Sequence, residues 1–157
     1  MSHRVLFVCL GNICRSPLAE AAFRAEAQGL GLNVEADSAG TGGWHAGEPP
    51  DRRAIAAARR NDIDISHLRA RQVTASDFER FDHIVALDGE NLADLAAIRP
   101  AGSRARLSLL LDHAAGREGQ AVADPYHGGD SHFDITWRDV NEGARGLAAA
   151  LRGENAR

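Results

Sequence analysis

The chain has 157 residues, of which 44% are hydrophobic, enough apolar material for one core in a single domain spanning residues 1–157. Its formal net charge is −4, and its 18 cationic residues are all arginines spread along the chain, so no basic stripe marks a nucleic-acid surface. The absence of lysine also excludes a Walker-type nucleotide loop and Schiff-base chemistry.

Cysteine content and hydropathy suggest a cellular location. The two cysteines, Cys9 and Cys14, are too few for a disulfide framework or a four-cysteine zinc site, which favours a reducing compartment. The apolar run near the start is too short for a signal peptide, and no window is apolar enough to span a membrane. We therefore expect a cytoplasmic protein with no obligate partner. The histidines show no zinc-like spacing, so we expect neither a metal nor a cofactor.

Strand and helix patterns alternate along the chain. In chain order, they predict a strand at 5–10, a helix at 17–28, a strand at 34–38, helices at 51–60 and 74–80, a strand at 83–87, a helix at 89–98, a strand at 106–111 and a helix at 134–152. Capping residues are expected at Ser16, Thr74 and Asp88. The polar segment 112–131 is unusually long for a loop, which is typical of functional segments.

This alternation predicts an α/β fold with an open four-stranded parallel sheet and helices on both faces. In such sheets ligands bind outside the carboxyl ends of the strands. Residues 9–16 fall at that edge, directly after the first strand.

The segment after the first strand carries the clearest chemical signal. It reads Cys-Leu-Gly-Asn-Ile-Cys-Arg-Ser, residues 9–16, and leads into Pro17. A loop wrapped before a helix N-terminus aims N–H groups at an anion, and the guanidinium of Arg15 adds a bidentate donor for phosphate oxygens. The same environment favours the thiolate form of Cys9, a nucleophile to which Ser16 can donate its hydroxyl. The remaining predicted phosphate-binding residues are Leu10, Gly11, Asn12, Ile13 and Cys14.

These residues resemble the signature loop of the low-molecular-weight protein tyrosine phosphatases. The likeness continues over nearly the whole chain, through Ser-Pro-Leu-Ala-Glu (16–20), Asp-Ser-Ala-Gly-Thr (37–41), Ser-His-Leu-Arg-Ala-Arg-Gln (66–72), Asp-Phe (77–78), Phe-Asp (81–82) and Asp-Pro-Tyr (124–126). The resemblance implies hydrolysis of phosphotyrosine in a protein substrate through a phosphocysteine intermediate on Cys9, with Arg15 binding the phosphate.

The same resemblance assigns the general acid and base to Asp124, although an Asp-Pro pair by itself more often marks a turn. Asn12 is expected in a left-handed conformation, with side-chain bonds to Ser16, Ser38 and His67. His67 is interpreted as a support for the loop, paired with Glu20, and not as a proton carrier.

Three further residues are predicted to form the walls of the substrate site: Trp44, Tyr126 and His127. Aromatic walls favour a planar phenyl phosphate over shorter alkyl phosphates. Many family members carry a second Tyr where this chain has His127, so the peptide preference stays open. Cys14, inside the loop, is expected near Cys9, where a reversible disulfide would protect the nucleophile from overoxidation.

Three alternatives remain at this stage. Arsenate-reducing relatives need further cysteines downstream, and none follows Cys14. Phosphoarginine phosphatases usually carry Thr at the position of Ile13, so Ile13 favours phosphotyrosine on steric grounds. A phosphate-binding module with a dead site is disfavoured by the complete set of Cys9, Arg15 and Asp124.

Overall fold

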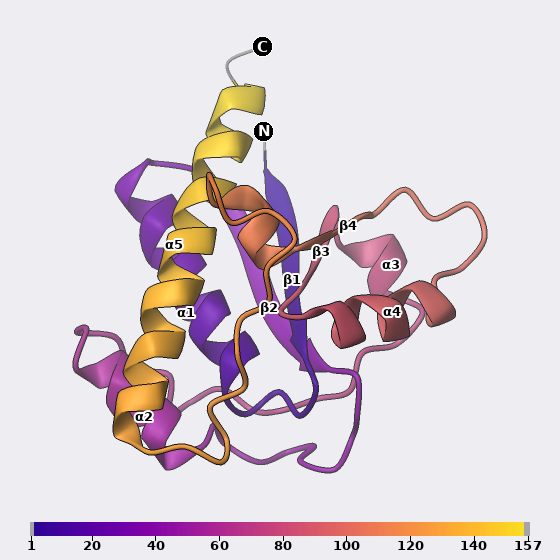
Figure 1. Cartoon of the computed structure of the whole chain (residues 1–157). Coiled ribbons are helices and arrows are strands. Elements are labelled where there is room, and N and C mark those ends of the chain that lie inside the picture. The colour runs from indigo at the N-terminus through magenta and orange to yellow at the C-terminus, as the bar shows by residue number, and fades with distance from the viewer. Residues whose placement is uncertain (1, 156–157) are drawn as a thin grey trace.

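Four parallel strands form one sheet in the computed structural model, which describes residues 2–155. The strands are β1 (His3–Cys9), β2 (Val34–Gly40), β3 (His83–Ala86) and β4 (Arg106–Leu109). Their spatial order is β2-β1-β3-β4, so the chain leaves β1 for one neighbour and later returns to pair on its other side. The predicted open parallel sheet is therefore confirmed (Figure 1).

Helices cover both faces of this sheet. One face carries α1 (Arg15–Gly29), α2 (Arg52–Arg59) and α5 (Asp130–Asn155), and the other carries α3 (Asp77–Arg80) and α4 (Gly89–Ile98) (Figure 1). Side chains of β1 alternate between the two cores because successive strand residues point to opposite faces. Val5, Phe7 and Cys9 enter the core under α1 and α5. Leu6 and Val8 enter the core under α4.

The segment from β4 onward differs most from the predicted elements. β4 ends at Leu109, two residues earlier than expected, and a short 3-10 helix, η1 (Leu110–His113), follows. The chain turns there because Asp112 accepts hydrogen bonds from the backbone N–H groups of Leu109 and Gly119. α5 begins at Asp130 and ends at Asn155, longer at both ends than the predicted helix. The connecting loop is correspondingly shorter.

Two predicted caps also need correction. Ser16 does not cap the first helix, because α1 already begins at Arg15 with Cys14 at its N-cap. Ser76, not Thr74, is the N-cap of α3. The predicted cap at Asp88 is confirmed, since its side chain accepts from the backbone N–H of Asn91 at 2.7 Å. Among residues 2–155, no helix is both long and apolar enough to cross a bilayer.

Candidate active site

The candidate site lies at the carboxyl edge of the sheet, between the ends of β1 and β3. The chain passes from β1 to β2 in one direction and reaches β3 on the other side, which makes this position a switch point of the sheet, where open α/β folds bind ligands. A cavity of about 250 Å³ opens here. Its lining residues are Cys9, Leu10, Gly11, Ile13, Cys14, Arg15, Trp44, His45, Asp124, Tyr126 and His127.

The backbone of the loop at residues 10–14 is arranged as an anion cradle. The carbonyl groups of Cys9, Leu10 and Ile13 accept hydrogen bonds from residues outside the loop, so they are turned away from its centre. The N–H groups of residues 11–14 have no protein acceptor within the described chain. Together with the N-terminus of α1, which has no side-chain cap, these free donors favour a bound anion.

Asn12 holds the loop in shape, as predicted. Its φ of 59° lies in the left-handed region. Its Nδ2 donates to Ser16 Oγ at 2.8 Å and to Ser38 Oγ at 3.0 Å. The predicted bond to His67 is wrong, because Asn12 Oδ1 accepts from the backbone N–H of Arg71 at 3.0 Å. The segment that contains His67 thus supports the loop through its backbone, while the His67 side chain is exposed.

The sulfur of Cys9 lies at the bottom of the cavity, 3.0 Å from Ser16 Oγ. Cys9 is 3% exposed and Ser16 is fully buried. Because Asn12 already donates to Ser16 Oγ, the Ser16 hydroxyl hydrogen has two acceptors in reach, the sulfur at 3.0 Å and the carbonyl of Ala39 at 3.4 Å, of which the sulfur is the nearer. Ser16 Oγ therefore contacts the Cys9 sulfur from inside the helix and does not act as the helix cap.

Arg15 is a buried cation held by acceptors from three parts of the chain. Its Nη1 donates to Asp88 Oδ2 at 2.6 Å and to the carbonyl of Val122 at 3.1 Å, and its Nη2 lies 3.7 Å from Asp124 Oδ2. Burial alone would lower the pKa of Arg15, but Cys9, Asp88 and Asp124 outweigh it and raise the pKa above its ordinary value. The guanidinium is therefore charged and fixed in direction.

The segment after η1 brings Asp124 to this edge. Val122 is fully buried and its N–H donates to the carbonyl of Leu87, just after β3, at 2.8 Å. Two residues later, Asp124 reaches the lip of the cavity with its side chain 46% exposed. Its Oδ1 accepts from the backbone N–H of Tyr126 at 3.1 Å, which orients the carboxylate. This loop therefore folds back over the sheet edge.

The second cysteine of the loop has a different environment. Cys14 is 4% exposed. Burial, followed by the charges of Asp51 and Cys9, raises the pKa of its thiol well above the ordinary range. Cys14 is consequently a neutral thiol at physiological pH, whereas Cys9 faces the free N–H groups and Arg15.

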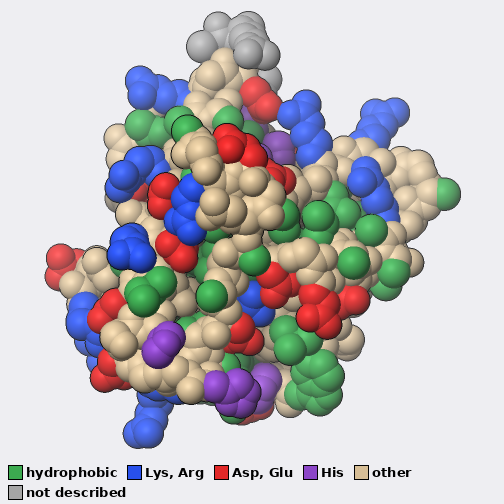
Figure 2. Space-filling view, viewed as in Figure 1, with side chains coloured by type: hydrophobic (Ala, Val, Ile, Leu, Met, Phe, Trp, Pro, Cys, Tyr) green, Lys and Arg blue, Asp and Glu red, His purple; other side chains and the backbone are tan. Residues whose placement is uncertain are grey.

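Aromatic side chains surround the cavity mouth. Trp44 is 72% exposed, and the rings of Tyr126 and His127 meet edge to face with centroids 5.1 Å apart. Figure 2 shows hydrophobic and histidine side chains gathered at the lower end of the molecule, where the loops after the strands lie. The three predicted wall residues thus all line the same cavity.

Of the two other predicted supports, Ser38 is confirmed by its bond to Asn12, whereas the predicted pairing of Glu20 with His67 is wrong. Ser38 binds Asn12 as described above. Glu20 is 2% exposed, and its ion-pair partner is Arg24, whose Nε lies 3.1 Å from Oε2, and not His67. Burial raises the pKa of Glu20 against the opposing effect of Arg24.

The sequence reasoning missed three residues around the site. Asp88 was expected only as a helix cap, yet it also binds Arg15. His45 lines the cavity beside Trp44. Arg53, held by Asp51, donates to the carbonyl of Gly128 and lies over the Tyr126 ring at 5.6 Å, so it ties α2 to the loop that carries Asp124. In the sequence, the only indication of these contacts was the acidic residue at the N-cap of α2 and of α4, Asp51 and Asp88.

Comparison with known proteins agrees with this geometry. A family model described as "Low molecular weight phosphotyrosine protein phosphatase" matches residues 4–157. A phosphatase of that name from Schizosaccharomyces pombe is 47% identical over 133 residues, covering 83% of this chain and 85% of the relative. The crystal structure of a protein tyrosine phosphatase from Entamoeba histolytica superposes with a TM-score of 0.91 at 32% identity, covering 98% of this chain and 99% of the other.

A more distant solved structure is the YwlE arginine phosphatase, in a Cys-to-Ser variant with a phosphorylated active-site serine. It superposes with a TM-score of 0.89 at 27% identity, covering 98% of both chains. The family match and the identity to the yeast relative together show that this chain belongs to the low molecular weight phosphotyrosine protein phosphatases, which are phosphoric monoester hydrolases.

Proposed function

We propose that this enzyme hydrolyses phosphotyrosine in protein substrates through a phosphocysteine intermediate on Cys9. The observation that carries the proposal is the position of the Cys9 sulfur at the base of a cavity with free N–H groups, beside the fixed guanidinium of Arg15. A phosphate dianion in this cradle places its phosphorus above the sulfur, with the ester oxygen directed toward the mouth. The Ser16 hydroxyl stabilises the thiolate before attack and after release.

The reaction takes two displacements at phosphorus. In the first, the thiolate of Cys9 forms the S–P bond while the P–O bond to the phenol breaks, and Asp124 donates a proton to the departing oxygen. In the second, Asp124 removes a proton from water, the resulting hydroxide attacks phosphorus, and the S–P bond breaks to return the thiolate and inorganic phosphate. Arg15 and the loop N–H groups bear the negative charge of both transition states. The phosphorylated active-site serine of the YwlE variant supports attack from the cysteine position.

The substrate class follows from the walls of the site. Trp44 and Tyr126 offer apolar surface on either side of a phenyl ring, and Ile13 and Leu10 line the passage to the phosphate. A phenyl ring spans this passage, whereas the short side chain of phosphoserine leaves the aromatic surface uncovered. We therefore infer a preference for phosphotyrosine.

A peptide comparison tests the substrate class. One peptide carrying phosphotyrosine, phosphoserine or phosphoarginine at the same position is offered to the purified enzyme, and kcat/KM is measured for each. We expect the phosphotyrosine peptide to be turned over fastest. A faster reaction with phosphoarginine would overturn the substrate assignment, and no turnover of any peptide would indicate a dead site.

The acid role of Asp124 is tested with aryl phosphates of graded leaving-group ability. General acid catalysis contributes about 10²–10⁴-fold, so Asp124→Ala is expected to slow poor leaving groups most. Cys9→Ser is the matched variant for the nucleophile and should abolish turnover while phosphate-analogue binding remains. An equal loss with every leaving group would remove Asp124 from the acid role.

A further inference from the structure

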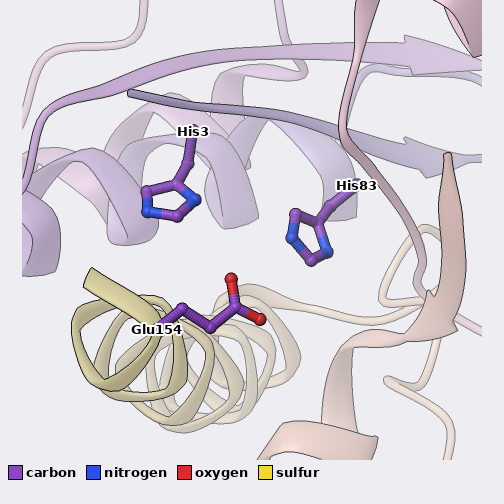
Figure 3. Close-up of side chains that lie close together, drawn as sticks. All are labelled: His3, His83 and Glu154. Atoms are coloured by element: carbon purple, nitrogen blue, oxygen red, sulfur yellow. The ribbon is translucent and has the colours of Figure 1, made fainter. Parts of the chain in front are cut away.

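We propose that His3, His83 and Glu154 form a binding site for a divalent transition-metal cation such as Zn²⁺. One ligand atom from each residue lies within 4.8 Å of the other two. Figure 3 shows the carboxylate of Glu154 directed toward the gap between the two imidazole rings. These residues are far apart in the sequence, and only the fold brings them together.

The sheet register explains why both histidines face the same helix. His3 begins β1 two residues before Val5, and His83 begins β3 two residues before Val85. Val5 and Val85 both enter the core under α5. Since strand residues two apart share a face, both imidazoles lie on the α5 side of the sheet. Glu154 stands in the last turn of α5 and completes the cluster.

The donor set suits zinc. Two imidazoles and one carboxylate are a recognised three-ligand combination for Zn²⁺, with the fourth position left for water. Bonds of about 2.1 Å around a tetrahedral ion put the ligand atoms about 3.4 Å apart. Closing the present separations therefore takes side-chain movements on the order of 1 Å, within the range of rotamer adjustment. Glu154, which is only half-buried, leaves a path for the ion from solvent.

Neighbouring groups orient two of the ligands. His3 Nε2 lies 2.7 Å from Asn155 Oδ1. Because that oxygen only accepts, Nε2 carries the hydrogen and the Nδ1 lone pair is free, which is the second-sphere arrangement typical of metal-binding histidines. Arg106 Nη1 lies 2.8 Å from Glu154 Oε1, which leaves Oε2 for the ion. Arg106 is itself 69% exposed, so this pair is weakly held.

The position of the site defines its role. His3 and Cys9 begin and end β1, so the cluster lies about 20 Å from the nucleophile at the opposite edge of the sheet. A bound ion would join the starts of β1 and β3 to the end of α5. We therefore expect the metal to stabilise the fold without entering the phosphatase reaction.

Metal binding is measured on the untagged full chain carrying Cys9→Ser and Cys14→Ser, so that no thiolate competes for the ion. Zn²⁺ is titrated by calorimetry, and Co²⁺ is titrated by visible absorption. We expect one equivalent per chain, a Co²⁺ spectrum without thiolate charge-transfer bands, and a higher thermal midpoint with Zn²⁺. His3→Ala, His83→Ala or Glu154→Gln in this parent should each weaken binding roughly tenfold or more and remove the thermal shift.

His67→Ala provides the matched control, since this exposed histidine lies outside the cluster, and it should bind Zn²⁺ like the parent. His83 is 7% exposed, so His83→Ala can fail to fold. In that case Glu154→Gln, at the end of α5, is the variant that tests the site. The proposal is overturned if the parent binds no Zn²⁺, or if Glu154→Gln and His3→Ala bind it as tightly as the parent.

Discussion

The two carboxylate oxygens of Asp88 accept hydrogen bonds from two different residues. Oδ1 accepts from the N–H of Asn91 and so caps α4, while Oδ2 binds Arg15 at 2.6 Å. A buried arginine without such a partner would have to be ordered by the substrate. We therefore expect Asp88 to act as a positioning residue for Arg15, the proposed phosphate-binding cation, and not as a catalytic residue.

Asp88→Asn separates these two tasks. Asn caps a helix about as well as Asp, so the thermal midpoint should stay close to that of the parent. Hydrogen bonds to charged groups contribute about 1.5–3 kcal/mol, so kcat/KM for an aryl phosphate should fall about tenfold or more. Asp88→Ala should show the same loss of activity and, in addition, lose about 1 kcal/mol of stability with the cap. Parent-like kcat/KM in both variants would contradict the role.

Cys14 permits a second test at a single side chain. Oxidation of Cys9 to a sulfenic acid is expected to be followed by attack of the Cys14 sulfur, forming a disulfide that a dithiol reverses. Peroxide-inactivated parent enzyme should therefore recover with dithiothreitol, while Cys14→Ser should be lost irreversibly. The raised pKa of Cys14 predicts that the disulfide forms faster as pH rises. Equal recovery of both proteins would exclude the protective role.

The loop between β1 and α1 depends on one left-handed residue. Asn12→Ala removes three hydrogen bonds and leaves a Cβ residue at φ 59°. We expect a loss of about 2–4 kcal/mol in unfolding free energy, together with a lower kcat. Asp62 is the matched control, because it has φ 64° in an exposed turn. Asp62→Ala should cost about 1–2 kcal/mol and leave kcat unchanged. Equal effects of both variants on kcat would contradict the loop role.

Helix α1 also contains a buried acid whose pKa predicts a pH dependence. The pKa of Glu20 is raised by burial, against the effect of Arg24, and its Oε1 has no hydrogen-bond partner within the described chain. The folded state thus binds the proton more tightly than the unfolded state. Its contribution to stability is complete below the ordinary value of 4.5 and is lost as pH rises through the folded-state pKa.

Urea unfolding at a series of pH values above 4.5 tests this effect. The unfolding free energy of the parent should decline with rising pH more steeply than that of Glu20→Gln, which cannot ionise. Glu79→Gln, at an exposed position without an ion pair among the described residues, should follow the parent. Parallel curves for the parent and Glu20→Gln would contradict the raised pKa.

Element types could be predicted from local patterns, whereas several boundaries and side-chain partners could not. The apolar run of β1 and the Gly-Asn turn after it define a strand and a loop without any knowledge of the fold. Ser16 looks like a helix cap by position, but its hydroxyl is taken by Asn12 and Cys9 once the loop closes. The end of β4 depends on Asp112 accepting from Gly119, a contact that needs the later chain in place.

At the scale of the whole molecule, the sequence pattern does not determine the order of the strands in the sheet, and several side-chain contacts depend on that order. Asp88 meets Arg15 only because β3 pairs beside β1, and the alternation of strands and helices leaves this order undetermined. The same pairing brings His83 beside β1 and, with the end of α5, close to His3. The family resemblance could supply Asp124 as the proposed general acid, since its motif is contiguous, but it gave no indication of contacts that depend on this chain's own side chains.

Helix α5 approaches η1 closely at two of its glycines, Gly143 and Gly146. A Cβ added at Gly146 of α5 would lie 1.8 Å from the carbonyl oxygen of His113 in η1, while one at Gly153 would have no atom within 4 Å. Gly146→Ala must therefore move α5 away from η1 and should destabilise the protein by about 1–3 kcal/mol or more. Gly153→Ala should add up to about 1 kcal/mol through helix propensity. Chemical denaturation gives the unfolding free energy of each variant and so distinguishes close packing from helix propensity. If both variants were more stable than the parent, α5 would not lie against η1.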